Sequence, residues 1–105
     1  MSNTPETKVK KAIKKYFDRL SDEGQLIYSE VREAGGYQFR KGLPDMWAII
    51  NGVHLEIEIK RPDGGRRSTM QLKWELIFDK LGVPYCCVDS PEQLDAVIKK
   101  LGLIN

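Results

Sequence analysis

The dipeptide Asn51-Gly52 separates two stretches in which apolar and polar residues alternate. Asn-Gly is the strongest short-range signal for a β-hairpin with a two-residue type I′ turn, because both turn residues then adopt positive φ. The pattern predicts strands over residues 44–50 and 53–60, joined directly by this turn. An antiparallel pair in the middle of the chain is therefore the framework around which the other elements are placed.

A two-residue turn also determines which residues face each other across the hairpin. One face is expected to be apolar and to belong to the core: Ile50 opposite Val53, Ala48 opposite Leu55, Met46 opposite Ile57, and then Ile59. The other face carries Ile49 opposite His54, Trp47 opposite Glu56 and Asp45 opposite Glu58, followed by Lys60, since strand side chains alternate between faces. A slip of one residue would bury the carboxylates, so the register is well specified.

Two directly opposed carboxylates need a physical explanation. The Cβ atoms of such a pair lie about 5 Å apart, and the charges repel by roughly 3 kcal/mol at an effective dielectric near 20. One interpretation is a solvated patch that Lys60 and nearby bases neutralise. The other is a site for a divalent cation, where oxygen-only ligands favour magnesium or manganese over zinc. A lysine beside metal-bound water would then help to generate or position hydroxide.

Before the hairpin, the sequence predicts a helix and a strand. The helix begins at Pro5 with Thr4 as its N-cap and continues to Leu20, and the strand covers residues 25–32.

After the hairpin, two capping boxes mark helix starts. Ser68 and Gln71 open a helix that ends at Gly82. Its apolar stripe is expected to face the core and consists of Met70, Trp74, Ile77 and Leu81. A strand over 83–88 leads to Ser90 and Gln93, which open the last helix. The order α-β-β-β-α-β-α indicates an α/β fold with a mixed central sheet flanked by helices, and with a right-handed parallel crossover between the third and fourth strands.

Length and composition restrict the class of protein. A chain of 105 residues, 41% hydrophobic and 30% charged, is expected to form one globular domain over residues 1–105. No apolar run approaches the roughly 18 residues that span a membrane, and the N-terminus lacks the apolar stretch of a secretory signal. Cys86 and Cys87 are adjacent, so an internal disulfide is not expected and a reducing compartment fits. A single histidine excludes His-rich zinc sites.

Basic residues are concentrated in two segments. Residues 8–19 contain six lysines and arginines against one acid, and residues 60–73 contain five against one acid. One interpretation of a basic helix face is that it is simply exposed to solvent. Two basic segments on either side of an acidic centre instead favour a polyanionic ligand held over a metal-binding carboxylate cluster.

At this point the motifs resemble those of a known family. The run Lys41-Gly42-Leu43-Pro44-Asp45, followed after a hairpin by Glu58-Ile59-Lys60-Arg61-Pro62, is similar to the PD-(D/E)xK nuclease signature. Glu6 early in the first helix, and Ser68 with Gln71 at the next, resemble the VRR-NUC (virus-type replication-repair nuclease) branch. Such domains occur alone in phages, the type that this chain resembles, and fused in the Fanconi-associated nuclease. The resemblance implies a restriction-endonuclease-like αβββαβ core, to which this chain adds a C-terminal helix.

The resemblance also implies roles for individual residues. Asp45, Glu58, the Ile59 carbonyl and Glu6 would be metal ligands, with Lys60 as the catalytic lysine. Glu6 is also explained as a partner of the helix dipole, although its spacing from Val9 and Ile13 places it on the inward stripe. Gln71 is either a site residue or only part of its capping box.

Other polar and aromatic residues receive weaker assignments. Glu56 shares the charged face but matches no ligand position, so it is at most an outer group. Trp74 is expected in the core, and His54 lies too far along the hairpin from Asp45 to take part. Contacts to DNA phosphates are expected from Arg40, Lys41, Arg61, Arg66 and Arg67.

These observations lead to one expected function and two rivals. The expected protein is an intracellular endonuclease dependent on Mg²⁺, with Mn²⁺ as a substitute. It would cut branched DNA such as Holliday junctions or flaps as a homodimer, and a phage-encoded form would act in the host cytoplasm. One rival is a non-catalytic nucleic-acid-binding module, which does not explain the opposed carboxylates. The other is a metal-stabilised structural protein, which does not need Lys60 on the acidic face.

Overall fold

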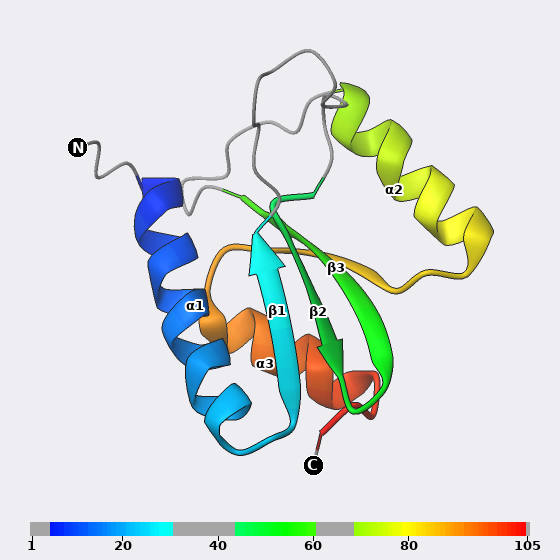
Figure 1. Cartoon of the computed structure of the whole chain (residues 1–105). Helices are drawn as coiled ribbons and strands as arrows, with labels where there is room; N and C mark the ends of the chain where they lie inside the picture. The colour runs from blue at the N-terminus through cyan, green and yellow to red at the C-terminus, as the bar shows by residue number, and fades with distance from the viewer. Residues whose placement is uncertain (1–4, 31–43, 61–68, 105) are drawn as a thin grey trace.

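Four strands form one mixed sheet in the order β1-β2-β3-β4. The computed structural model describes residues 5–30, 44–60 and 69–104. Its elements are α1 (Pro5–Asp22), β1 (Leu26–Glu30), β2 (Met46–Ile50), β3 (Val53–Ile59), α2 (Thr69–Leu81), β4 (Tyr85–Val88) and α3 (Pro91–Lys100). Strands β1, β2 and β3 pair antiparallel, whereas β4 pairs parallel to β3 after the α2 crossover. The predicted element order and mixed sheet are confirmed (Figure 1).

The hairpin has the predicted turn and register. Asn51 and Gly52 have φ of 48° and 88°, the left-handed region that a type I′ turn requires. Residues Met46 to Ile50 pair with Ile57 to Val53 as the alternation predicts. The turn is also tied to the C-terminal end of the chain, because Asn51 Nδ2 donates a hydrogen bond to the Leu103 carbonyl at 2.7 Å.

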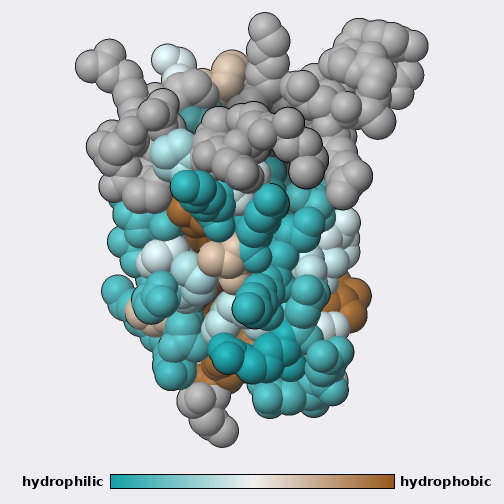
Figure 2. All heavy atoms as spheres, turned by 90° about the vertical axis from the view of Figure 1, so that its left-hand side faces the viewer, coloured by the Kyte–Doolittle hydropathy of each residue, from teal (hydrophilic) through white to brown (hydrophobic). Residues whose placement is uncertain are grey.

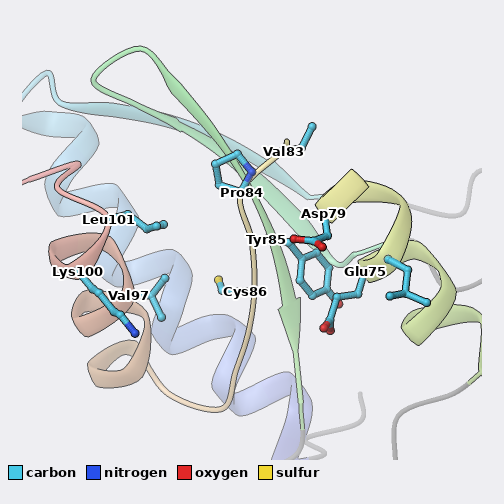
Figure 3. Close-up of a pocket in the computed structure, with 10 residues that line it drawn as sticks. Glu75, Asp79, Val83, Pro84, Tyr85, Cys86, Val97, Lys100 and Leu101 are labelled. Carbon is cyan, nitrogen blue, oxygen red and sulfur yellow. The ribbon is translucent and has the colours of Figure 1, made fainter. Parts of the chain in front are cut away.

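The core lies between the sheet and two helices. Helices α1 and α3 cover the same face, and the buried apolar residues include Ile13, Phe17, Met46, Ala48, Ile50, Leu55, Ile57, Ile59, Leu94 and Ile98. Val53, predicted on this face, is 36% exposed, because it sits beside the turn at the end of the hairpin. Figure 3 shows α3 and α2 on opposite sides of β4, so α2 belongs to the second face of the sheet.

Helix α2 does not pack as its sequence predicts. None of its residues is buried, and Met70 and Leu81 of the expected inward stripe are 38% and 71% exposed. One contact to the sheet comes from aromatic rings: Phe78 lies 5.8 Å from Tyr85 of β4 and also packs against Trp74 of its own helix at 5.9 Å. The second face of the sheet is rich in polar and aromatic side chains, so α2 rests on a few rings rather than on an aliphatic layer.

Several smaller predictions have clear outcomes. Ser90 Oγ accepts a hydrogen bond from the Gln93 amide, and Gln93 Oε1 accepts one from the Asp89 amide, so the last capping box is confirmed. The other caps, Thr4 and Ser68, lie outside the described residues. Neither Cys86 nor Cys87 forms a disulfide within the described part of the chain, in agreement with the prediction. Within the described ranges, no helix has the length and apolar character needed to cross a membrane.

Candidate active site

Glu58 is the residue that most clearly marks the candidate active site. It lies on the second face near the end of β3, is 2% exposed, and is the one buried charged residue in the described part of the chain. Its Oε2 atom accepts a hydrogen bond of 2.6 Å from Gln71 Nε2, in the first turn of α2. Burying a carboxylate costs several kcal/mol unless its surroundings compensate. A carboxylate in such a place is therefore a strong candidate for chemistry.

Gln71 is thus more than a capping residue. Its amide reaches across from α2 and holds one oxygen of Glu58, which fixes the orientation of that carboxylate. The sequence left this open, because Gln71 also fits the capping pattern with Ser68, which lies outside the described residues. The geometry favours the site role.

Asp45 lies at the start of β2, beside the end of β3, but not where the register alone predicts. The β2–β3 ladder begins at the Met46–Ile57 pair, and Asp45 occupies a bend just before it. Its Oδ2 atom accepts a hydrogen bond of 2.8 Å from the Ile59 amide. The expected direct opposition of Asp45 and Glu58 within the ladder is therefore corrected: the Asp45 carboxylate turns toward the backbone of β3 and finds a donor there.

Lys10 is a site residue that sequence reasoning missed. Its Nζ lies 3.9 Å from Asp45 Oδ1, and both side chains are about two-thirds buried. The signal in the sequence was its position next to Val9, at the edge of the buried stripe of α1. Together with the Ile59 amide, Lys10 offsets the charge of Asp45, so this carboxylate has structural partners on two sides.

Ile59 and Lys60 occupy the end of β3. The N–H and C=O of one strand residue point to the same side, so the Ile59 carbonyl lies on the side where Asp45 accepts the Ile59 N–H. Lys60 is half-buried, and its backbone amide bonds to the Val88 carbonyl at 2.9 Å. Alternation along β3 places the Lys60 side chain on the face of Glu58. The Asp45, Glu58 and Lys60 set is thus brought to one end of the sheet.

Glu6 is not on the buried stripe. It is exposed, whereas Val9, Ile13, Phe17 and Leu20 form the buried side of α1. The first turn of α1 extends beyond the end of β1 (Figure 1), so the helical spacing continues although Glu6 itself is not buried. The prediction that Glu6 is functional because its carboxylate would be costly to bury is therefore wrong.

Among the described residues, no three His, Cys, Asp or Glu side chains are gathered as a metal-binding group.

The far end of the hairpin has its own interactions. His54 Nε2 contacts the Glu56 carboxylate, and the His54 ring stacks on Trp47 with centroids 5.6 Å apart. The Glu56 carboxylate therefore interacts with His54, on the side of the hairpin turn. The arginines and lysine predicted to contact DNA, Arg40, Lys41, Arg61, Arg66 and Arg67, lie outside the described residues.

A hollow of about 430 Å³ lies away from this site, at the edge of the sheet between α2 and α3 (Figure 3). Apolar side chains such as Leu76, Val97 and Leu101 contribute to its lining, and Asp45, Glu58 and Lys60 do not. It is therefore separate from the candidate active site.

The donor atoms of the site fit a hard divalent cation. Two carboxylates and one backbone carbonyl supply oxygen only, which suits magnesium or manganese. A buried carboxylate in the position of Glu58 is also what such an ion stabilises. Asp45, Glu58 and the Ile59 carbonyl would hold the ion.

The αβββαβ core, with carboxylates and a lysine at one end of its sheet, defines a nuclease domain of the PD-(D/E)xK class. No family model matches the sequence, and no curated protein does. The structure is similar to a solved structure described as "VRR_NUC domain", with a TM-score of 0.73 and 28% identity over 91% of this chain and 96% of that one. The chain is therefore similar in both fold and sequence to a VRR-NUC domain, the family that its motifs resemble.

Proposed function

We propose that this protein is a divalent-metal-dependent endonuclease that hydrolyses phosphodiester bonds in branched DNA. The observation that carries the proposal is Glu58, a carboxylate 2% exposed on a small domain. Asp45 and Lys60 lie at the same end of the sheet and supply the other groups that phosphodiester hydrolysis needs.

Each residue of the site has a distinct task. Asp45, Glu58 and the Ile59 carbonyl would hold the metal ion, which when bound would polarise the scissile phosphate and lower the pKa of water. Lys60 orients or deprotonates the attacking water and offsets charge on the phosphate. Gln71 holds Glu58 in position, and Lys10 does the same for Asp45.

The preference for branched DNA rests on the architecture of the described residues. Their helices and strands all belong to the nuclease-like fold and none forms a separate base-reading element, so we propose that the domain recognises DNA by shape. Phosphate contacts by Arg40, Lys41, Arg61, Arg66 and Arg67 would position DNA without reading sequence. Cutting both strands of a junction needs two active sites, so we propose a homodimer with two-fold symmetry.

A cleavage panel tests the proposal. Linear duplex, single-stranded, flap and four-way-junction DNA are incubated with the protein in magnesium, in manganese and in EDTA. We expect cleavage of the branched substrates in both metals and none in EDTA. Cutting that persists in EDTA would refute the metal dependence, and equal cutting of linear duplex would refute the substrate preference. DNA binding without cleavage in any metal would favour the non-catalytic module instead.

The variant Lys60→Met tests the mechanism. It is expected to abolish cleavage and to change DNA affinity by no more than a few-fold, because one lysine is a small part of the phosphate-binding charge. A variant that keeps half of the parent's rate would remove Lys60 from the chemistry.

Light scattering at micromolar concentration tests the homodimer, and a monomer mass with and without DNA would contradict it.

A further inference from the structure

One face of α1 carries a row of exposed basic side chains. Lys8, Lys11, Lys15 and Arg19 are all exposed, and their spacing of three and four residues places them on one side of an α-helix. Helix α1 holds six basic and three acidic residues, a formal charge of +3. The whole chain carries +2, so the rest of the molecule is −1. The net positive charge of the chain is therefore contributed by α1.

The lysines that face the sheet behave differently from those of this row. Lys10 and Lys14 lie near Asp45 and Glu30, at 3.9 Å and 3.1 Å. Lys8 and Lys15 form no ion pair with any described residue. Lys8 and Lys15 thus present their charge outward, on a side of the molecule that is mostly hydrophilic (Figure 2).

This arrangement weakens the helix that carries it. Like charges three and four residues apart repel along a helix face, and lysines in the first turns oppose the helix dipole. Solvation alone would be served equally well by alternating charges. A ligand that supplies several negative charges in a line would compensate for the repulsion.

We propose that Lys8, Lys11 and Lys15, here called the α1 stripe, bind the phosphate backbone of a duplex DNA arm that extends from the candidate active site. The inference rests on the proposed function, because it assumes that DNA is the substrate. Lys8 and Lys15 are separated by about 10 Å along the helix axis, a length over which one strand of B-DNA presents about three phosphates. The Lys10–Asp45 contact places the same helix directly beside the site.

Salt dependence of binding tests the stripe. The variant combines Lys8→Gln with Lys15→Gln, and its matched control combines Lys80→Gln with Lys100→Gln, two exposed lysines near the ends of α2 and α3. Both pairs lower the net charge equally. Binding to a labelled four-way junction is measured in EDTA between about 50 and 300 mM salt, so that cleavage does not interfere. Each lost phosphate contact reduces the slope of log K against log salt by about 0.9.

We expect the slope of the stripe variant to be reduced by about two, and that of the control by less than one. The stripe variant is also expected to melt no lower than the parent, because it loses repulsive pairs. Equal slopes for the two variants would overturn the inference even if the parent cleaves DNA. A parent that neither binds nor cleaves DNA would overturn the proposed function, and the stripe with it.

Discussion

Replacing Glu58 with glutamine is expected to stabilise the metal-free protein. Glu58 is 2% exposed, and keeping such an ion away from water costs several kcal/mol. Glutamine has the same shape and still offers an oxygen to Gln71, whose amide donates at 2.6 Å. That bond loses its charge assistance, about 1 kcal/mol. We therefore expect a net gain of about 1–2 kcal/mol, or about 4–8 °C in Tm for a domain of this size.

Thermal unfolding of parent and variant, each in EDTA and in excess magnesium, measures this effect. A ligand that binds only the folded state raises Tm. Magnesium is therefore expected to stabilise the parent and to leave Glu58→Gln nearly unchanged. Glu56→Gln is the matched control, because it is the same substitution on the same strand and face, and its carboxylate contacts His54. This control should keep the magnesium response of the parent.

A Glu58→Gln protein that melts below the parent in EDTA would refute the reasoning. It would show that the surroundings stabilise the charge of Glu58 by more than burial costs. Equal magnesium responses in parent and variant would remove Glu58 from the proposed ligands, while leaving the burial argument intact.

Three further predictions concern other residues. Asp45→Asn keeps an oxygen for the Ile59 amide but loses the charge that strengthens this bond and faces Lys10; urea unfolding should show a loss of about 1 kcal/mol, and a gain would restore the opposed-carboxylate interpretation. Tyr16→Phe removes the hydroxyl that donates to Asp95 at 2.8 Å and joins α1 to α3, so we expect a loss of about 1 kcal/mol; an unchanged urea midpoint would contradict it. Burial raises the pKa of the Cys86 thiol to about 12, so the stability that this thiol contributes is complete below about pH 9 and is lost as pH rises toward 12. Urea midpoints at about pH 8 and 11 should fall less for Cys86→Ala than for the parent, and equal falls would assign the alkaline loss to other groups.

The hairpin shows what local sequence determines. Strand alternation and the Asn51-Gly52 turn depend only on neighbouring residues, so the register from Met46 to Ile57 could be derived without any structure. The last capping box is local in the same sense, since Ser90 and Gln93 are three residues apart. Such features need no knowledge of what packs against them.

The errors arise where a partner distant in sequence decides the outcome. The amphipathic pattern of α2 does not reveal that the sheet face below it offers the ring of Tyr85 rather than aliphatic side chains. Glu6 has the spacing of the buried stripe, but its turn lies past the end of β1. Asp45 leaves the ladder because the Ile59 amide and Lys10 are available to it, and neither contact can be read from alternation.

The light burial of α2 has a consequence for hydrogen exchange. A segment with few buried contacts opens locally at a lower free energy than the whole domain, and α2 contributes no buried residue. Gln71 belongs to α2, while its partner Glu58 belongs to β3. Each local opening of α2 therefore also releases the buried carboxylate from its amide donor. Amide exchange in α2 would report how often the candidate active site loses the hydrogen bond from Gln71 to Glu58, while the amides of β2 and β3 stay protected.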